Sequence, residues 1–374
     1  MDIRSLSARF GINAERKREG GFPVFERQMR GRRVLLVADE TTARFLPSVA
    51  ERAGRNAAAC GTLVLPSPEP IADEETVGAV SDGAEGYDYL LAVGAGTLND
   101  LCKYAGSLTH KPSGVFATAA SMDGFTSGVT PLIENGFKIT RPAQTVSDIL
   151  MDFDVLCAAP RMMTGAGVGD ILAKYCALTD WRLSSALTGE AVNEEAFSLM
   201  YDAVRACDDA LPALGRGKPA GVEKLMDALL ISGYAMVIAG NSRPASGAEH
   251  HMSHYLEMDF LRRRKRIPLH GVKVGLGTMV SLYLYHTLPR RPAFGGKQSV
   301  CAEAEKLPQP ETVERALKMF GCPTRFSQLG VDRDTVRNMF FEAWKLRDRF
   351  TILTLYCTKG WMQDTADELL ERFF

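Results

Sequence analysis

Short apolar runs alternate with segments of helical spacing over the first part of the chain. Each run is apolar at consecutive positions, which is typical of strands buried on both faces of a sheet. Strands of this kind separated by helices predict a parallel sheet with helices packed over it. The predicted strands are 34–38, 62–65, 89–93 and 114–118, and the predicted helices lie at 41–55, within about 71–81, and from about 98 onward.

A different pattern follows the fourth predicted strand. Two short apolar segments, 129–133 and 137–140, flank the dipeptide Asn135-Gly136. Asn-Gly between such segments is the strongest short-range signal for a β-hairpin, because both residues tolerate the positive φ of its turn. Residues 145–155 form one more apolar segment, and Pro160 marks a break.

Beyond Pro160 the spacing is helical and convincing strands are absent. Long stretches at 170–186, 192–211 and 221–239 combine helical periodicity with helix-forming residues. The fold class predicted is therefore an α/β nucleotide-binding domain at 1–159 followed by an all-α domain at 160–374. Cofactor and substrate commonly meet where two such domains adjoin.

Composition narrows the function classes. The 374 residues are 46% hydrophobic and 24% charged, as in ordinary globular proteins, and the formal net charge of -1 provides no field for nucleic acid. No apolar run is long enough to cross a bilayer, and residues 1–20 lack the apolar core of a signal peptide. We therefore expect a cytoplasmic protein without nucleic-acid binding or membrane insertion. The cysteines are scattered without a C-x-x-C pair, which predicts reduced and mostly buried thiols, at Cys60, Cys102, Cys157, Cys176, Cys207, Cys301, Cys322 and Cys357.

The histidines are clustered: four of the six lie between positions 250 and 270. His250 and His254 are four residues apart, so they project from one face of a predicted helix, and His270 opens the next helix. His251 points off that face, and we expect it to be structural. Two imidazoles from different helices plus one carboxylate could hold a divalent metal and leave a coordination position open.

The candidate carboxylate is Asp170, which follows Gly165-Ala-Gly167-Val-Gly169. We place it at the start of a helix just past the domain boundary. Two other interpretations stay open from spacing alone. A His-x-x-x-His pair on a helix is often a surface or core pair, and an Asp at a helix start is often a cap.

Two glycines indicate a nucleotide site. Gly94 and Gly96 follow a predicted strand and open a predicted helix, where a backbone can approach a pyrophosphate. Many strand-to-helix turns share this G-x-G pattern. Asp39, at the end of the first strand, could accept hydrogen bonds from an adenosine ribose and favour NAD over NADP, or could be a loop carboxylate. Residues 118–128 are rich in small and hydroxylic side chains, which suit contact with phosphate or nicotinamide, although a plain loop is the alternative.

Taken together, these segments resemble the sn-glycerol-1-phosphate dehydrogenase family, within the dehydroquinate synthase-like and iron-containing alcohol dehydrogenases. They run in order over about residues 30–280. The strings Ser-Arg-Pro-Ala-Ser-Gly-x-Glu-His and Ser-Met-Asp-Gly are the most specific to this branch. The matching strings are Gly94-Ala-Gly-Thr-Leu-Asn-Asp100, Ser121-Met-Asp-Gly124, Gly169-Asp170 with Asp180-Trp181, Ser242-Arg-Pro-Ala-Ser-Gly247 with Glu249-His250, and His270-Gly271.

The resemblance implies a dehydroquinate synthase-like fold and a role for each matched position. Asp170, His250 and His270 would hold one divalent metal, zinc first and nickel or iron as alternatives. Asp123 and His254 would contact the substrate, with Asp170 also near it. The residues implied to line NAD(P)H are Gly94, Ala95, Gly96, Thr97, Leu98, Thr118, Ala119, Ala120, Ser121 and Ser127, with Asp39 at the ribose.

The activity implied is reversible, metal-dependent and NAD(P)H-linked reduction of dihydroxyacetone phosphate to sn-glycerol 1-phosphate. The metal would polarise the ketone, and His254 would orient the substrate or relay a proton. The partners expected are this small phosphorylated substrate and further copies of the chain, in a homodimer or larger assembly.

Other functions stay open on the same fold. A glycerol or other polyol dehydrogenase shares the metal site, and so does a cyclase of the dehydroquinate synthase type, although its first ligand is typically Glu rather than Asp170. A binding protein that kept the metal without turnover is a third. Two departures from the family pattern are Asn241, where a small residue is expected, and the basic run at 262–266, which could gather the substrate phosphate or be a solvated loop.

Overall fold

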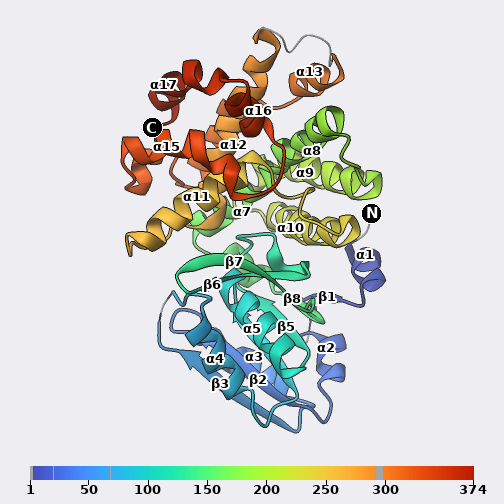
Figure 1. Ribbon diagram of the computed structural model, residues 1–374. Helices are drawn as coiled ribbons and strands as arrows, with labels where there is room; N and C mark the ends of the chain where they lie inside the picture. The colour runs from blue at the N-terminus through green and yellow to red at the C-terminus, as the bar shows by residue number, and fades with distance from the viewer. Residues whose placement is uncertain (1–2, 20, 68, 292–297) are drawn as a thin grey trace. The chain divides into compact units, whose positions relative to one another are not determined.

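The structure is a computed structural model that describes residues 3–291 and 298–374, apart from residues 20 and 68 (Figure 1). By their internal contacts these residues form two compact units. The first comprises the chain up to Pro160 together with Gly217–Gly233, and the second comprises Arg161–Arg216 with Tyr234–Phe374.

The first unit includes part of a helix that was predicted to belong to the domain at 160–374. The hydroxyl of Thr126 donates a hydrogen bond to the carbonyl of Leu230, at 2.8 Å. A Cβ on Gly233 would lie 2.0 Å from the Thr126 hydroxyl, so the glycine permits this close approach. The predicted division into one domain at 1–159 and another at 160–374 stays a prediction.

The first unit is built on a six-stranded sheet in the order β1-β8-β5-β4-β2-β3, in which every neighbouring pair is parallel. All four strands expected in the first part of the chain are confirmed, with bounds shifted by at most three residues. The strands are β1 (Asn13–Arg16), β2 (Arg33–Asp39), β3 (Ala59–Leu65), β4 (Tyr89–Gly94), β5 (Ser113–Ala117) and β8 (Asp148–Met151).

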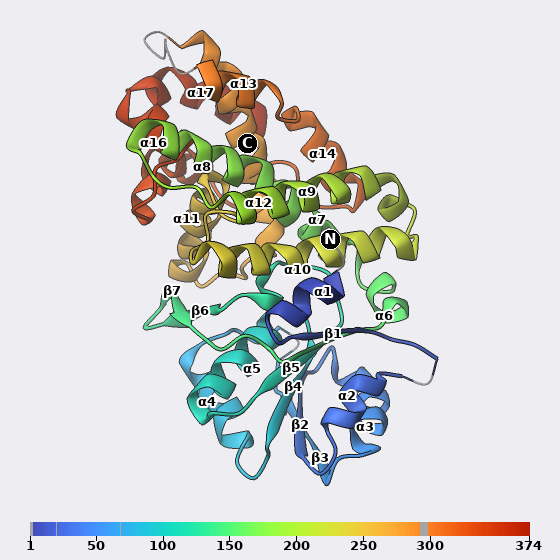
Figure 2. The same ribbon diagram turned by 90° about the vertical axis from the view of Figure 1, so that its right-hand side faces the viewer.

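Helices cover both faces of this sheet. In Figure 2, α4 and α5 lie on one side of it, and α2 and α3 lie on the other. Their bounds are α2 Pro23–Gln28, α3 Leu46–Gly54, α4 Glu74–Gly83 and α5 Gly96–Thr109, with α1 at Ile3–Arg9 before the first strand.

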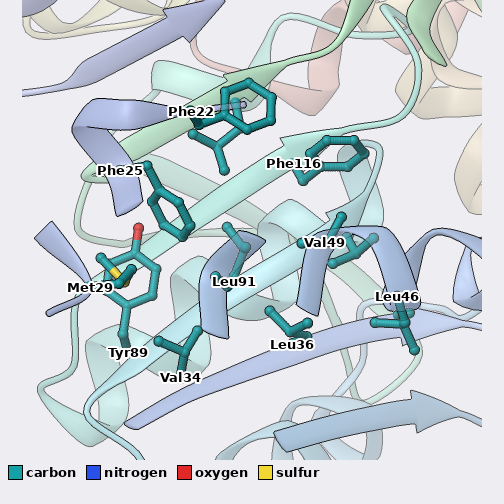
Figure 3. Close-up of a cluster of buried hydrophobic side chains, with 14 residues drawn as sticks. Phe22, Phe25, Met29, Val34, Leu36, Leu46, Val49, Tyr89, Leu91 and Phe116 are labelled. Carbon is teal, nitrogen blue, oxygen red and sulfur yellow. The ribbon is translucent and has the colours of Figure 1, made fainter. Parts of the chain in front are cut away.

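The core between the sheet and α2 and α3 explains the consecutive apolar positions. Alternate strand residues, among them Leu36 and Leu91, join Phe22 and Phe25 in one buried cluster (Figure 3). The intervening residues, such as Leu90, are also fully buried. Because both faces are covered, a strict apolar run is more stable here than an alternating one.

Strand β1 was missed because it carries the polar sequence Asn-Ala-Glu-Arg. It lies at the edge of the sheet, where hydrogen bonds from side chains hold it in place. Asn13 donates to the Asp148 carboxylate at 3.0 Å, and Glu15 accepts from the backbone N–H groups of Val24 and Phe25 at 3.0 and 2.9 Å. Apolar periodicity does not report bonds of this kind.

The predicted hairpin is confirmed as β6 (Val129–Glu134) paired antiparallel with β7 (Phe137–Pro142). Asn135 and Gly136 have φ values of 51° and 78°. Positive φ at both central residues is the geometry of a type I′ turn, which explains the preference for Asn-Gly there.

The second unit is helical and contains no strand among the residues that the structure describes. The stretch expected as one helix from 170 is two helices, because α7 ends at Leu172 and α8 begins at Lys174. Between Arg161 and the C-terminus the longer helices are α7 Arg161–Leu172, α8 Lys174–Thr188, α9 Glu194–Gly215, α10 Pro219–Ala239, α11 Ala248–Arg262, α12 His270–Thr287, α14 Pro310–Met319, α15 Arg333–Glu342 and α17 Trp361–Phe373.

None of the seven described cysteines forms a disulfide, and four of them are buried. The eighth, Cys301, has a side chain outside the described part of the chain. Within that part, no helix combines the length and the apolar character needed to cross a membrane.

Candidate active site

Three helices of the second unit bring together the three predicted metal ligands. Asp170 comes from α7, His250 from α11, and His270 is the first residue of α12. Their ligand atoms all lie within 4.8 Å of one another. The Asp170 and His250 side chains are buried, and His270 is partly exposed. A carboxylate and two imidazoles at this spacing are a donor set that zinc and related ions bind.

The helices α7, α11 and α12 lie together in Figure 1, and glycines allow them to approach this closely. A Cβ on Gly271 of α12 would lie 1.8 Å from the carbonyl oxygen of Ala166 on α7, and one on Gly169 would lie 2.3 Å from the carbonyl oxygen of Gly271. On the other side of α12, a Cβ on Gly277 would lie 2.7 Å from the Glu249 carbonyl oxygen of α11. Backbone contact at these points sets the neighbouring ligands side by side.

The predicted position of Asp170 at a helix start is wrong. It lies in the last turn of α7, one residue after Gly169. The three glycines that precede it, Gly165, Gly167 and Gly169, are inside the same helix, where glycine permits close packing. Asp170 is fully buried and does not cap a helix, and its Oδ1 atom lies 2.6 Å from the ammonium of Lys174, which is also fully buried.

Glu249 orients His250. Its Oε1 atom lies 2.9 Å from Nδ1 of the imidazole and also accepts the backbone N–H of Gly247 at 2.6 Å. Nε2 of His250 then faces Asp170, with 3.7 Å to Oδ1. A carboxylate on the far nitrogen of a ligand histidine fixes its tautomer and raises its basicity. The local arrangement therefore fits a metal ion.

A second buried carboxylate, Asp180, supports this region. It accepts hydrogen bonds from the Tyr285 hydroxyl and from the backbone N–H groups of Ala248 and Ile352, at 2.6, 2.7 and 2.7 Å. Burial, followed by the nearby charge of Glu249, raises the pKa of Asp180. Its three donors tie the start of α11 to α8, α12 and the start of α16 (Ile352–Thr358).

The remaining histidines of the cluster differ in environment. The ring of His254 lies beside those of His250 and His270, with centroid distances of 6.3 and 6.1 Å. Its Nδ1 atom is 3.5 Å from the Glu257 carboxylate. His251 is buried away from the donor set, and burial lowers its pKa to about 3. Its structural role stays a prediction.

In the first unit, the nucleotide signals gather at one point of the sheet. Strands β2 and β4 are neighbours in the sheet; the chain leaves β2 toward β3 and leaves β4 toward β5, so these two connections run in opposite directions. Ligands bind at the carboxyl ends of strands at such a switch point. Asp39 ends β2, and the Gly94–Leu98 turn follows β4. These two predicted cofactor contacts are therefore on adjacent strands.

The chain after β5 joins the same edge. The backbone N–H of Thr118 donates to the Gly94 carbonyl at 3.0 Å, so the two loops lie together. Residues Thr118, Ala119, Ala120 and Ser121 are all buried. Ala95 precedes the first residue of α5, where free N–H groups favour a phosphate. Asp39 accepts the N–H and the hydroxyl of Thr42, at 2.7 and 2.9 Å.

Lys103 organises the loop that carries Asp123 and Ser127. Its buried ammonium lies 3.1 Å from the Ser127 hydroxyl and donates to the carbonyls of Gly124 and Val129, at 3.1 and 2.9 Å. The Ser127 hydroxyl thus has partners within the protein, and its contact with cofactor stays a prediction. Asp123 accepts a hydrogen bond from the Ser232 hydroxyl at 2.7 Å. Its contact with substrate also stays a prediction.

The basic run at 262–266 is exposed. Arg262 and Arg263 both pair with Asp259, and Arg263 also pairs with Asp332 at 2.7 Å. The Lys265 ammonium donates to the Gly330 carbonyl. Part of the charge in this loop is therefore compensated locally.

Glu249, Lys174 and Lys103 also belong to these sites and were not predicted from the sequence. Glu249 carried a signal, because a carboxylate directly before a ligand histidine can orient it. Lys174 also carried a signal, because it stands four residues after Asp170, a spacing that brings two side chains together on a helix.

Comparison with known proteins identifies the fold. The family model for iron-containing alcohol dehydrogenases matches residues 20–160. Among solved structures, an iron-containing alcohol dehydrogenase from Thermococcus thioreducens superposes with a TM-score of 0.71 and 17% identity, covering 97% of this chain and 98% of that one. Glycerol dehydrogenase from Schizosaccharomyces pombe gives a TM-score of 0.67 at 17% identity, covering 96% and 91%. The fold is therefore that of the iron-containing alcohol dehydrogenases.

Sequence relatives define the family within this fold. A glycerol-1-phosphate dehydrogenase [NAD(P)+] from Bacillus velezensis is 38% identical over 78% of this chain and 77% of its own. The protein of that name from Geobacillus stearothermophilus is 36% identical over 88% of both chains, and one from the archaeon Methanosarcina mazei is 34% identical over 71% and 68%. The chain belongs to the glycerol-1-phosphate dehydrogenase family.

Proposed function

We propose that the protein catalyses reversible hydride transfer from NAD(P)H to C2 of dihydroxyacetone phosphate, which yields sn-glycerol 1-phosphate and NAD(P)+. The hydride goes to the carbonyl carbon and one proton goes to its oxygen. The donor set of Asp170, His250 and His270, with Glu249 behind His250, is the observation that carries this proposal. The substrate class is supported by the names of the relatives.

The metal site has three protein donors, so substrate oxygens could complete the shell. We propose zinc as the ion, with nickel and iron as alternatives for the same donors. When bound, the metal would act as a Lewis acid toward the ketone. Asp170 and the two imidazoles would hold it, and Glu249 would keep Nε2 of His250 directed at it.

His254 would supply the proton or orient the substrate. Its ring lies next to both ligand imidazoles but outside the donor set. Asp123 is proposed as a second substrate contact. In the first unit, the Gly94–Leu98 turn, residues 118–121 and Ser127 would bind the dinucleotide, with Asp39 at the adenosine ribose, an arrangement that favours NADH. A homo-oligomer and a cytoplasmic location stay predictions.

The test is an NADH-oxidation assay on dihydroxyacetone phosphate, with protein that is stripped of metal and then given zinc, nickel or iron. We expect turnover only with metal, and much slower oxidation of glycerol by NAD+. Preference for glycerol would favour a polyol dehydrogenase. A reaction without net NADH consumption would favour a cyclase.

His250→Ala tests the metal site within the same assay. It should lose the metal and fall in kcat by at least ~100-fold while NADH still binds, since a Lewis acid supplies several kcal/mol of transition-state stabilisation. His286→Ala is the matched control, because that imidazole lies within 3.0 Å of the Pro308 carbonyl and outside the cluster. Full activity of His250→Ala without metal would refute the proposal.

A further inference from the structure

We propose that Glu257 is a positioning residue that fixes the ring of His254, and that Lys273 holds Glu257 in place for this purpose. The inference rests on the proposed function, in which His254 meets the substrate. It adds two residues that act through the imidazole and do not touch the reacting atoms.

The geometry begins on α11. Glu257 follows His254 by three residues, so both side chains lie on the same side of the helix. Its Oε2 atom lies 3.5 Å from Nδ1 of the His254 ring. The Glu257 side chain is buried, with 8% of the residue exposed. A buried carboxylate facing one nitrogen of an imidazole selects the tautomer that carries its proton there.

The position of His254 shows why its orientation matters. Its ring centroid lies 6.1 Å from that of His270 and 6.3 Å from that of His250. The ring is therefore next to the donor set while its nitrogens stay outside it. With Nδ1 facing Glu257, Nε2 is the nitrogen that would meet the substrate. In the imidazolium form both nitrogens carry a proton: the Nε2 proton passes to the substrate oxygen as hydride reaches carbon, and the neutral ring that results keeps its proton on Nδ1, facing Glu257.

Lys273 supplies the second link. It stands one turn after His270 on α12, and only 1% of the residue is exposed. Its ammonium donates to the Pro268 carbonyl at 2.5 Å and lies 3.9 Å from Oε1 of Glu257. A buried cation beside a buried carboxylate favours the ionised form of both. The carboxylate that holds His254 is thus kept negative and tied to the helix that begins with His270.

A purely structural role is the alternative. In that case Glu257 and Lys273 would only join α11 to α12, and their loss would lower stability or metal affinity, with activity falling in proportion. Positioning of His254 predicts a fall in kcat while metal content and KM are kept. The two roles are separated by comparing these quantities.

The experiment uses the zinc-loaded full chain with Glu257→Gln and Glu257→Leu. Gln keeps an oxygen that can accept from Nδ1 and loses the charge, so we expect kcat to fall about 10-fold. Leu loses both, and we expect a fall of about 100-fold, within the range that one general acid contributes. Zinc content and the KM for both substrates should stay within about threefold of wild type. Asp259→Asn is the matched control on α11, since its carboxylate pairs with Arg262 and Arg263 instead.

A second measurement is independent of turnover. With only six histidines in the chain, ring-¹⁵N labelling resolves each imidazole, and His254→Gln assigns the signal. We expect the Nδ1-protonated tautomer in wild type and a mixture of tautomers in Glu257→Leu. Unchanged ring signals, or loss of zinc parallel to the loss of kcat, would overturn the proposal. A wild-type protein inactive on dihydroxyacetone phosphate would instead refute the proposed function, with the ring signals still testing the role of Glu257.

Discussion

The contact between α7 and α12 at Gly271 should decide whether the metal site forms. The Cβ of an alanine at this position would lie 1.8 Å from the Ala166 carbonyl oxygen, whereas real Cβ atoms essentially never approach below 3.0 Å. The helices must therefore separate locally by about 1.2 Å, the difference between these distances. Metal-ligand distances tolerate about 0.2 Å. Asp170 is one residue from Gly169 on α7, and His270 directly precedes Gly271, so the shift would draw two ligands apart.

We expect Gly271→Ala to weaken zinc binding by at least ~100-fold, a loss at or above the range seen when ligand orientation is disturbed. Stability of the metal-free protein should fall by about 1–3 kcal/mol from overpacking. The assay is competition with a chromophoric chelator, together with thermal unfolding with and without zinc.

Gly275→Ala on the same helix is the control. Its new Cβ would meet the two Leu317 methyl groups at 3.1 Å, which can rotate away, and the Cα of Gly169 at 3.4 Å, which is an ordinary van der Waals contact. This variant should keep wild-type affinity, with stability changed by less than about 1 kcal/mol. If Gly271→Ala bound zinc as tightly as wild type, the helix contact would not set the ligand spacing.

Two other predictions concern buried charges. Burial raises the pKa of Asp100 from 3.8 to about 7, with the nearby Lys103 ammonium opposing it. Because the native state then holds a proton that the unfolded state releases, this contribution to stability is present below about pH 4 and lost as the pH rises through about 7. As the pH rises from about 4 to about 7, the free energy of unfolding of Asp100→Asn should therefore increase relative to that of wild type by about 2–4 kcal/mol, measured by urea unfolding. A difference between the two proteins that does not change with pH would contradict this. Lys174→Met removes the ammonium 2.6 Å from Asp170, so the metal-free protein should lose about 3–5 kcal/mol. Zinc should raise the unfolding temperature of this variant more than that of wild type, and an equal rise would argue against charge competition at Asp170.

Local patterns were sufficient where neighbours in sequence decide the structure. The four strands at 34–38, 62–65, 89–93 and 114–118 were visible because a strand buried on both faces must be apolar throughout. The Asn135-Gly136 turn was visible because few other residues adopt positive φ twice in succession. His250 and His254 could be placed on one helix face from their spacing alone.

The tertiary structure decided what depends on contacts between distant segments. Asp170 was expected at a helix start, whereas it and the glycines before it lie inside α7. The packing of α7 on α12 explains these glycines, because a missing side chain permits backbone contact there. Strand β1 formed from polar residues because its edge position lets side-chain hydrogen bonds replace apolar packing.

For the active site, sequence supplied the residue types and the order of the motifs, from which Asp170, His250 and His270 could be named. It could not show that the carboxylates behind the imidazoles and the ammonium groups beside them are buried. Glu249 directly precedes a ligand histidine and Lys174 stands four residues after Asp170, whereas Glu257 and Lys273 carry no such signal. For all four the importance arises from burial and from distances of 2.6 to 3.9 Å. A charge is costly only once water is excluded from it, and that exclusion is a property of the folded chain.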